Sequence, residues 1–289
     1  MFCVYDLHSH STASDGTLSP RALVQRAAEA GVEVLALTDH DTTAGIAEAS
    51  QAADEFGLAL IPGVEVSVTW NRQTVHLVGL NIDPLDPHLS EGLKRLRDFR
   101  EWRAEEIGRK LEKAGISGAY EGALALAEGS LVSRTHFARF LVQSGIVEDE
   151  RKVFKRFLVS GKPGHVPGEW ATLEEAVGWI HGAGGEAVIA HPARYKMTRS
   201  KLRQLLKAFV GLQGDALEVV SGSHSRDDYI NMARHAKDFD LMASAGSDFH
   251  CPENPWIALG RLPRLPEGCK PVWQNWNLSA QTELRSQLG

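Results

Sequence analysis

The chain has 289 residues, of which 43% are hydrophobic and 24% charged, and this ordinary globular composition excludes a disordered or fibrous protein. The length fits one barrel-sized domain with an insertion, or two smaller domains. A net charge of -6 argues against a surface that coats nucleic acid, although residues 91–167 hold 15 Lys and Arg against 11 Asp and Glu.

Apolar runs and helix caps predict that strand and helix alternate in the first third of the chain. A helix is predicted where Ser19 and Pro20 precede an amphipathic run, because Ser is a good N-cap and Pro suits the first helical position. The predicted order is strand 2–7, helix 20–30, strand 32–38, helix 42–56 and the extended segments 58–70 and 74–82.

Charged helices replace this pattern after Asp83, first over residues 89–114 and then in further stretches to about residue 158. Alternation then returns with helix 172–182, strand 186–190, helix 200–210, strand 216–220, helix 226–239 and strand 241–245. Such alternation implies right-handed crossovers and a parallel sheet, open or closed. We therefore predict an α/β barrel formed by residues 1–87 and 168–289, with residues 88–167 as a mostly helical insertion.

The sequence gives no sign of a membrane span or a secretion signal. Its three cysteines, Cys3, Cys251 and Cys269, form no C-x-x-C pair and leave an odd count, so neither a disulfide framework nor a zinc ribbon is indicated. We expect a cytoplasmic protein without membrane association.

Histidines and carboxylates follow nearly every predicted strand, where the loops of a parallel barrel meet at one face. The first strand runs into His8 and His10, and the last into Asp248 and His250. Residues i and i+2 of an extended chain point the same way, so each pair can reach one ion. Nine candidate metal ligands result: His8, His10, Asp15, His40, Glu65, His76, His191, Asp248 and His250.

Nine ligands exceed what one divalent ion uses, so the residues predict two or three ions. All are imidazoles or carboxylates, which suits Mn, Fe or Zn. A carboxylate such as Glu65 could bridge two ions. Adjacent ions lower the pKa of a bridging water from ~15.7 towards 7, so the expected reaction is phosphate ester hydrolysis by attack of a metal-bridging hydroxide.

The successive ligand motifs resemble, in order, those of PHP-domain (polymerase and histidinol phosphatase) metallohydrolases. They are Asp6-Leu7-His8-Ser9-His10, Asp15-Gly16, Thr38-Asp39-His40-Asp41, Gly63-Val64-Glu65, Ala190-His191-Pro192 and Ser247-Asp248-Phe249-His250. The resemblance implies a distorted seven-stranded, TIM-like barrel with three divalent ions, for which we expect Mn, with Fe and Zn as alternatives. It places His8, His10, Glu65 and Asp248 on one ion, Glu65, His76 and His191 on a second, and Asp15, His40 and His250 on a third.

Donors for a phosphate are expected beside these ligands, because a dianion needs partners other than the metals. We predict Arg134, which would reach down from an insertion that caps the active site, and Arg194, three residues after His191. His224 would bind phosphate or protonate the leaving oxygen, and Asp248 is predicted to be catalytic as well as a ligand. Lys162 is a further candidate for phosphate binding.

Within the PHP family, the long insertion and its segment Ser133-Arg134-Thr135-His136-Phe137-Ala138 resemble the branch of nucleoside 3',5'-bisphosphate phosphatases and 5'-to-3' exoribonucleases. We therefore predict hydrolysis of the 3'-phosphate of a small nucleotide such as pAp, giving AMP and phosphate. The alternatives are a 5'-to-3' exoribonuclease on short 5'-phosphorylated single-stranded RNA, a histidinol phosphate phosphatase and a metal-binding regulatory module without catalysis. No obligate protein partner is inferred.

Overall fold

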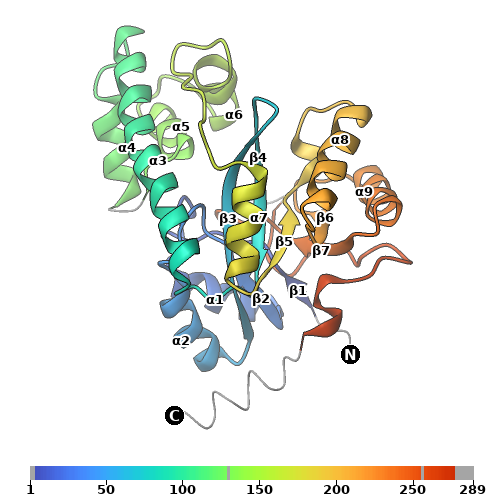
Figure 1. The fold of residues 1–289 in the computed structure, drawn as a ribbon. Coiled ribbons are helices and arrows are strands. Elements are labelled where there is room, and N and C mark those ends of the chain that lie inside the picture. The colour runs from blue at the N-terminus through green and yellow to red at the C-terminus, as the bar shows by residue number, and fades with distance from the viewer. Residues whose placement is uncertain (1–3, 129–130, 255–256, 277–289) are drawn as a thin grey trace.

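One curved sheet forms the centre of the molecule and closes into a near-complete barrel (Figure 1). The computed structural model describes residues 4–128, 131–254 and 257–276. Phe2 and Cys3 of the predicted first strand, and residues 277–289 of the predicted barrel, lie outside this part. Within it, the seven strands follow one another in chain order: β1 (Tyr5–Asp6), β2 (Val34–Leu37), β3 (Ala59–Trp70), β4 (Gln73–Leu80), β5 (Glu186–Ile189), β6 (Ala216–Ser221) and β7 (Met242–Gly246).

The barrel closes between its first and last strands. The backbone N–H of Leu7 donates to the carbonyl of Ala245 at 2.9 Å, and a parallel bridge joins Ser9 to Phe249. The loops after β1 and β7 therefore lie side by side, which brings together chain segments some 240 residues apart. The predicted barrel is confirmed.

The prediction of a parallel sheet is wrong for β4, which runs antiparallel to both β3 and β5. Only Asn71 and Arg72 separate β3 from β4, and a two-residue loop can join only antiparallel neighbours. Both residues have positive φ, 46° and 61°, as in the tight hairpin turns that match strand twist. The pairs on either side, β1–β2–β3 and β5–β6–β7, are parallel.

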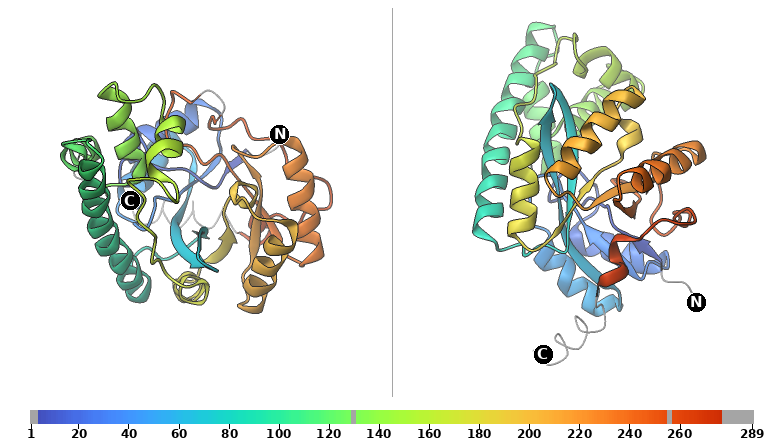
Figure 2. Two further views of the ribbon diagram at one scale, coloured as in Figure 1. Left: turned by 90° about the horizontal axis from the view of Figure 1, so that it is seen from above. Right: turned by 45° about the vertical axis from the view of Figure 1, so that its right-hand side comes forward.

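Helices surround the strands when the molecule is seen from above (Figure 2). Ser19 caps the first of them by accepting from the Ala22 N–H, and Thr172 and Ser225 head capping boxes. These helices confirm the predicted elements to within a few residues. They are α1 (Pro20–Glu29), α2 (Ile46–Phe56), α7 (Leu173–Gly182), α8 (Arg199–Gly211) and α9 (Arg226–Asp238).

A group of helices lies to one side, between β4 and α7 in the chain. It comprises α3 (Pro87–Lys113), α4 (Ala119–Ala127), α5 (Arg134–Gln143), α6 (Glu150–Val153) and the π-helix η1 (Phe154–Leu158). These helices bury a cluster of their own that includes Leu111, Phe137 and Leu158. Because this core is separate from those of the barrel, we propose that residues 88–167 are an insertion, which we call the helical insertion.

An apolar plug fills the barrel at the end opposite the carboxyl ends of its parallel strands. Its members include Leu7, Ile61 and Val188, and it is completed by Val272 and Trp273 of the 3₁₀ helix η3 (Val272–Asn275). Trp273 stacks on Tyr5 with ring centroids 4.3 Å apart. The polar interior is thereby confined to the other end. No helix in the described ranges combines the length and apolarity needed to cross a bilayer.

Candidate active site

All nine predicted ligands converge at the open end of the barrel. Six of them lie in the loops after β1, β2 and β7, and His191 follows β5 directly. Glu65 and His76 come from within β3 and β4, whose hairpin extends past the other strands. Three groups have ligand atoms within 4.8 Å of one another: His10, Asp15, His40 and His250; His8, Glu65, His191 and Asp248; and His40, Glu65 and His76.

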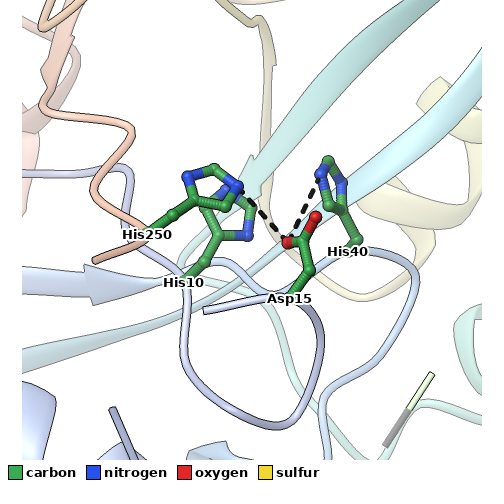
Figure 3. Close-up of side chains that lie close together, drawn as sticks. All are labelled: His10, Asp15, His40 and His250. Atoms are coloured by element: carbon green, nitrogen blue, oxygen red, sulfur yellow. Dashed lines mark ion pairs between the residues drawn. The ribbon is translucent and has the colours of Figure 1, made fainter. Parts of the chain in front are cut away.

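The first group surrounds one carboxylate (Figure 3). Oδ1 of Asp15 lies 3.3 Å from Nε2 of His250 and 4.0 Å from Nε2 of His40. The rings of His10 and His250 stack with centroids 4.1 Å apart. Four donor side chains from three separate loops thus face a common point.

Glu65 lies at the centre of the other two groups and is fully buried. Its Oε1 is 2.8 Å from Nδ1 of His76 and 2.9 Å from Nε2 of His191. Its Oε2 is 2.9 Å from Nδ1 of His40 and 3.3 Å from Nε2 of His10. A carboxylate with different imidazoles at each oxygen has the geometry expected of a bridging ligand.

The donor set fits divalent metal ions. Nε2 of His8 and Nε2 of His10 lie 3.1 Å apart, which matches two nitrogens each about 2.1 Å from one ion. Asp15 Oδ1, His40 Nδ1 and Glu65 Oε2 are buried, and although each lies near another candidate ligand atom, none makes a well-aligned hydrogen bond within the described part of the chain. Such atoms cost about 1–3 kcal/mol each when left unsatisfied, and a metal ion would satisfy them.

The grouping differs in detail from the one that the resemblance implies. His10 lies with Asp15 rather than with His8, and His191 lies with His8 rather than with His76. His10 also approaches Asp248, with Nε2 3.4 Å from Oδ1, so it faces two of the three groups. The assignment of single ligands to single ions therefore stays a prediction.

Electrostatics keep the carboxylates of the site ionised. Burial raises the pKa of Glu65, but the charges of His40, His76 and His8 outweigh it and hold that pKa well below its ordinary value. The pKa values of Asp15 and Asp248 are likewise held low, against their burial, by neighbouring cationic groups. Charged oxygens are the form that metal ions bind.

Glu218 of β6 is a buried carboxylate that the sequence analysis missed. Its Oε1 accepts from Nδ1 of His8 at 3.0 Å, and its Oε2 accepts from the backbone N–H of His191. The first bond fixes the His8 tautomer, so that Nε2 faces the ligand cluster. The second holds His191 in a backbone conformation with φ 28°, which is unusual for a residue other than glycine. A charged residue in the apolar run Ala216-Leu217-Glu218-Val219-Val220 was the available signal.

Beside the ligand cluster lies a cavity of about 290 Å³, which we call the catalytic cavity. Metal-ligand candidates form one wall, and the helical insertion and Trp170 form the other. Among the residues that line it are Arg100, Arg103, Arg134, Arg194, Ser133, Thr135, Phe154, Trp170 and Tyr195.

Three arginines from the helical insertion give this wall a positive charge. Arg100 is held by Asp41 at 2.6 Å and Ser67 at 2.9 Å, and Arg103 donates twice to the carbonyl of Val166. Arg134 stacks on Phe154, with its Cζ 5.7 Å from the ring centroid. Burial and the neighbouring guanidinium groups lower the pKa of Arg103 to about 9 and also lower that of Arg134. Converging buried cations of this kind favour an anionic ligand.

The predicted phosphate-binding residues divide into two pairs. Arg134 and Arg194 both line the catalytic cavity, and Arg194 is paired with Asp248. His224 and Lys162 do not line it. His224 is buried behind the 3₁₀ helix η2 (Pro192–Arg194), where Nε2 accepts from the N–H of Ala193 and Nδ1 lies 3.3 Å from the carbonyl of Val219. Both its ring nitrogens are thus occupied by backbone, while Lys162 lies exposed in a separate groove.

Comparison with known proteins decides the family. The sequence pattern of the PHP domain matches residues 6–158. The chain belongs to the PHP domain family. A 3',5'-nucleoside bisphosphate phosphatase of Chromobacterium violaceum is 51% identical to this PHP protein over 270 residues, 93% of this chain and 95% of the relative. The 5'-3' exoribonuclease Rnm of Escherichia coli is 49% identical over 284 residues, 98% and 97% of the two chains.

Solved structures agree with this placement. An amidohydrolase from Chromobacterium violaceum, solved with bound sulfate and no metal, matches with a TM-score of 0.92 and 50% identity over 96% of this chain and 97% of that one. A second structure, from Bifidobacterium adolescentis, matches with a TM-score of 0.79 and 26% identity over 99% and 97%. The predictions of a PHP barrel and of a metal-dependent phosphoesterase are confirmed.

Proposed function

We propose that this PHP protein removes the 3'-phosphate of nucleoside 3',5'-bisphosphates, converting pAp to AMP and phosphate. The observation that carries the proposal is the lining of the catalytic cavity, which combines candidate metal ligands of the barrel with arginines of the helical insertion. One wall holds the candidate metal ligands and the other holds Arg100, Arg103 and Arg134. A small molecule with two phosphates can place one against each wall, and the similarity to the Chromobacterium bisphosphate phosphatase supports this assignment.

The three ligand groups would hold three divalent ions, for which we expect Mn, with Fe and Zn as alternatives. Bound ions of this kind polarise phosphoryl oxygens and acidify water. Glu65 and Asp248 would supply negative charge between the ions, and Glu218 orients Nε2 of His8 towards the same ligand groups. No Ser or Cys nucleophile is required, because solvent provides the attacking oxygen.

The arginines bind and orient the substrate in this proposal. Arg100 and Arg103 are fixed by their protein partners, so they form a rigid support for a 5'-phosphate, while the Arg134 guanidinium can donate to the same group. Arg194 extends from the loop after His191 towards Asp248 and can hold the phosphate that is attacked. Phe154 and Trp170 offer ring surfaces of the cavity to the nucleoside.

The N-terminus of α5 joins the two walls. Ser133 Oγ and Thr135 Oγ1 donate to Oδ2 of Asp15 at 3.2 and 3.0 Å, which leaves Oδ1 facing the histidines. Arg134 lies between these two residues. The segment that positions one metal ligand therefore also positions the phosphate-binding arginine, so ion binding and substrate binding share one support.

A second candidate function, 5'-to-3' trimming of short RNA, is favoured by the same arginine wall. Anchoring a terminal 5'-phosphate there would place the first phosphodiester, rather than a 3'-phosphate, beside the metal ligands. Relatives named 5'-3' exoribonuclease in Escherichia coli and Haemophilus influenzae are 49% and 51% identical to this chain. Histidinol phosphate, which has one phosphate and a cationic amine, fits the arginine wall poorly. We also propose that the protein is cytoplasmic.

The test compares four substrates with Mn-loaded protein and identifies the products by mass. We expect AMP and phosphate from pAp, with AMP itself inert. Successive 5'-mononucleotides from a 5'-phosphorylated RNA oligomer would make the exoribonuclease primary, and phosphate from histidinol phosphate would contradict the role of the arginines. Stoichiometric metal binding without turnover of any of the four would favour the non-catalytic module.

A further inference from the structure

A second, larger cavity of about 930 Å³ opens on the outside of the helical insertion, and we call it the basic groove. Apolar side chains form part of its floor, and basic side chains predominate among its polar ones. It is lined by Val142, Gly145, Ile146, Val147, Glu148, Lys152, Lys155, Arg156, Val159 and Lys162.

Three of its four basic residues carry charge that the protein does not neutralise. Lys152 is paired with Glu148, the acidic residue of the groove. Lys155, Arg156 and Lys162 are exposed and form no ion pair within the described part of the chain. The groove therefore bears a local charge of about +3 on a protein whose net charge is -6. A local concentration of positive charge of this kind attracts polyanions.

Residues of one short helix, η1, line both the basic groove and the catalytic cavity. Phe154, the first residue of η1, lines the catalytic cavity, and the next two residues, Lys155 and Arg156, line the groove. The helix η1 thus contributes side chains to both cavities, and a ligand that extends from the catalytic cavity around η1 would reach Lys155 and Arg156. π-Helices are rare and occur frequently at functional sites.

We propose that the basic groove binds the sugar-phosphate backbone of single-stranded RNA whose 5'-terminal nucleotide occupies the catalytic cavity. This inference rests on the second function proposed above, the 5'-to-3' trimming of RNA, and it supplies a site for the nucleotides downstream of the cleaved bond. A cavity of about 290 Å³ is at the lower end of the range for small-molecule sites, so a longer chain must leave it. Lysines and an arginine suit phosphates, while Ile146, Val147 and Val159 suit ribose and base faces.

The proposal is tested by substrate length. Wild-type protein and a Lys155→Gln/Arg156→Gln variant are assayed on pAp and on 5'-phosphorylated oligoadenylates of increasing length. For wild type, we expect kcat/KM to rise over the first few added nucleotides and then level off. For the variant, we expect the rise in kcat/KM with RNA length to be about tenfold smaller than for wild type. Its kcat/KM on pAp should equal the wild-type value. Binding of the oligoadenylates by the variant should also depend less on salt. Because two phosphate contacts are lost, the slope of log K for RNA binding against log salt concentration should be smaller in magnitude by about 1.4.

Two controls separate local from general effects. A Lys207→Gln/Lys237→Gln variant removes two exposed charges from α8 and α9, and it should behave as wild type on every length. A Lys155→Arg/Arg156→Lys variant keeps the charges of η1 and should retain the gain. A length gain that survives the Gln substitutions, or an equal loss on pAp and on RNA, would overturn the proposal.

A binding measurement keeps the test independent of turnover. Anisotropy of a labelled 5'-phosphorylated oligoadenylate with EDTA-treated protein reports the groove even if the wild type hydrolyses neither substrate class. In that case the proposed function fails, while weaker binding by the Gln variant than by wild type would still support the groove. Equal binding by both would reject it.

Discussion

The barrel and the helical insertion contribute opposite charges to one cavity. The barrel supplies histidines and carboxylates from segments that lie far apart in the chain, and it buries most of them, while His40, His76 and His250 are partly exposed. The insertion supplies Arg100 and Arg103 from a single helix and Arg134 from another. The comparison suggests a division of labour in which the barrel holds metal and the insertion selects the anion. Variants in the two regions should therefore fail in different ways.

The largest effect is expected in the barrel from Glu65→Gln. Replacing this carboxylate removes negative charge from between five imidazoles, so ions are lost and activity should fall by about 1000-fold or more. Metal analysis of the purified variant, alongside its kinetics, checks the result. A variant that kept its full metal content and its activity would contradict the central role of Glu65.

Glu218→Gln is expected to weaken metal binding by about 10 to 100-fold without abolishing it. A Gln amide can still accept from His8, but its NH₂ group would face the N–H of His191, so one of two hydrogen bonds is lost. Chelator competition with Mn measures the effect. Glu186→Gln, on β5 and bonded to Trp276, is the matched control and should bind Mn as wild type does.

In the helical insertion, Arg134→Ala should raise KM for pAp by about 30-fold and leave metal content unchanged. The figure corresponds to the loss of charge-assisted hydrogen bonds to one phosphate, about 2 kcal/mol. Steady-state kinetics and metal analysis are compared for the same preparation. If metal were lost together with affinity, the Arg134 side chain itself would support the metal site, and its assignment to phosphate binding alone would be wrong.

His136→Gln should change stability in acid while leaving neutral-pH activity intact. Burial lowers the pKa of His136 to about 4, below its ordinary value of 6.5, so the unfolded chain takes up a proton before the folded one does. His136 therefore favours folding above pH 6.5 and loses this contribution, on the order of 2 kcal/mol, as the pH falls to 4.5. Gln can complete the same capping box with Ser133 and does not titrate. Denaturant unfolding of both chelated proteins at pH 7 and 4.5 measures the difference, which should be smaller for the variant.

The convergence of most candidate ligands could be predicted from the sequence because strand order alone places strand ends together. His8 and His10, or Asp248 and His250, need only an extended chain to share a direction. Arg100 and Arg103 could not be predicted, because which face of α3 meets the cavity depends on how that helix packs against the barrel. His224 was predicted on the correct side of the barrel, but its buried contacts with backbone are visible only in the structure.

The antiparallel direction of β4 also could not be predicted from hydrophobic periodicity. Alternating apolar residues predict a strand and its faces but not its direction, and the Asn71-Arg72 turn was the overlooked signal. Lys162 was a further candidate for phosphate binding, although a lone lysine in a loop such as Gly161-Lys162-Pro163-Gly164 is usually solvated. The loop instead turns outward after η1, which places the lysine in the basic groove.

The antiparallel direction of β4 also determines how long the helix that follows it must be. A chain that leaves β4 emerges at the plugged end of the barrel, and α3, 27 residues and about 40 Å long, carries it back past the open end (Figure 1). The length of α3 thus determines how far the helices from α4 to η1 lie from the candidate metal ligands. Each turn removed from α3 would bring these helices about 5.4 Å closer to the candidate ligands, and each turn added would move them the same distance away. Changes in the length of α3 would therefore alter the size of the substrate that fits and would also move Ser133 and Thr135 relative to Asp15.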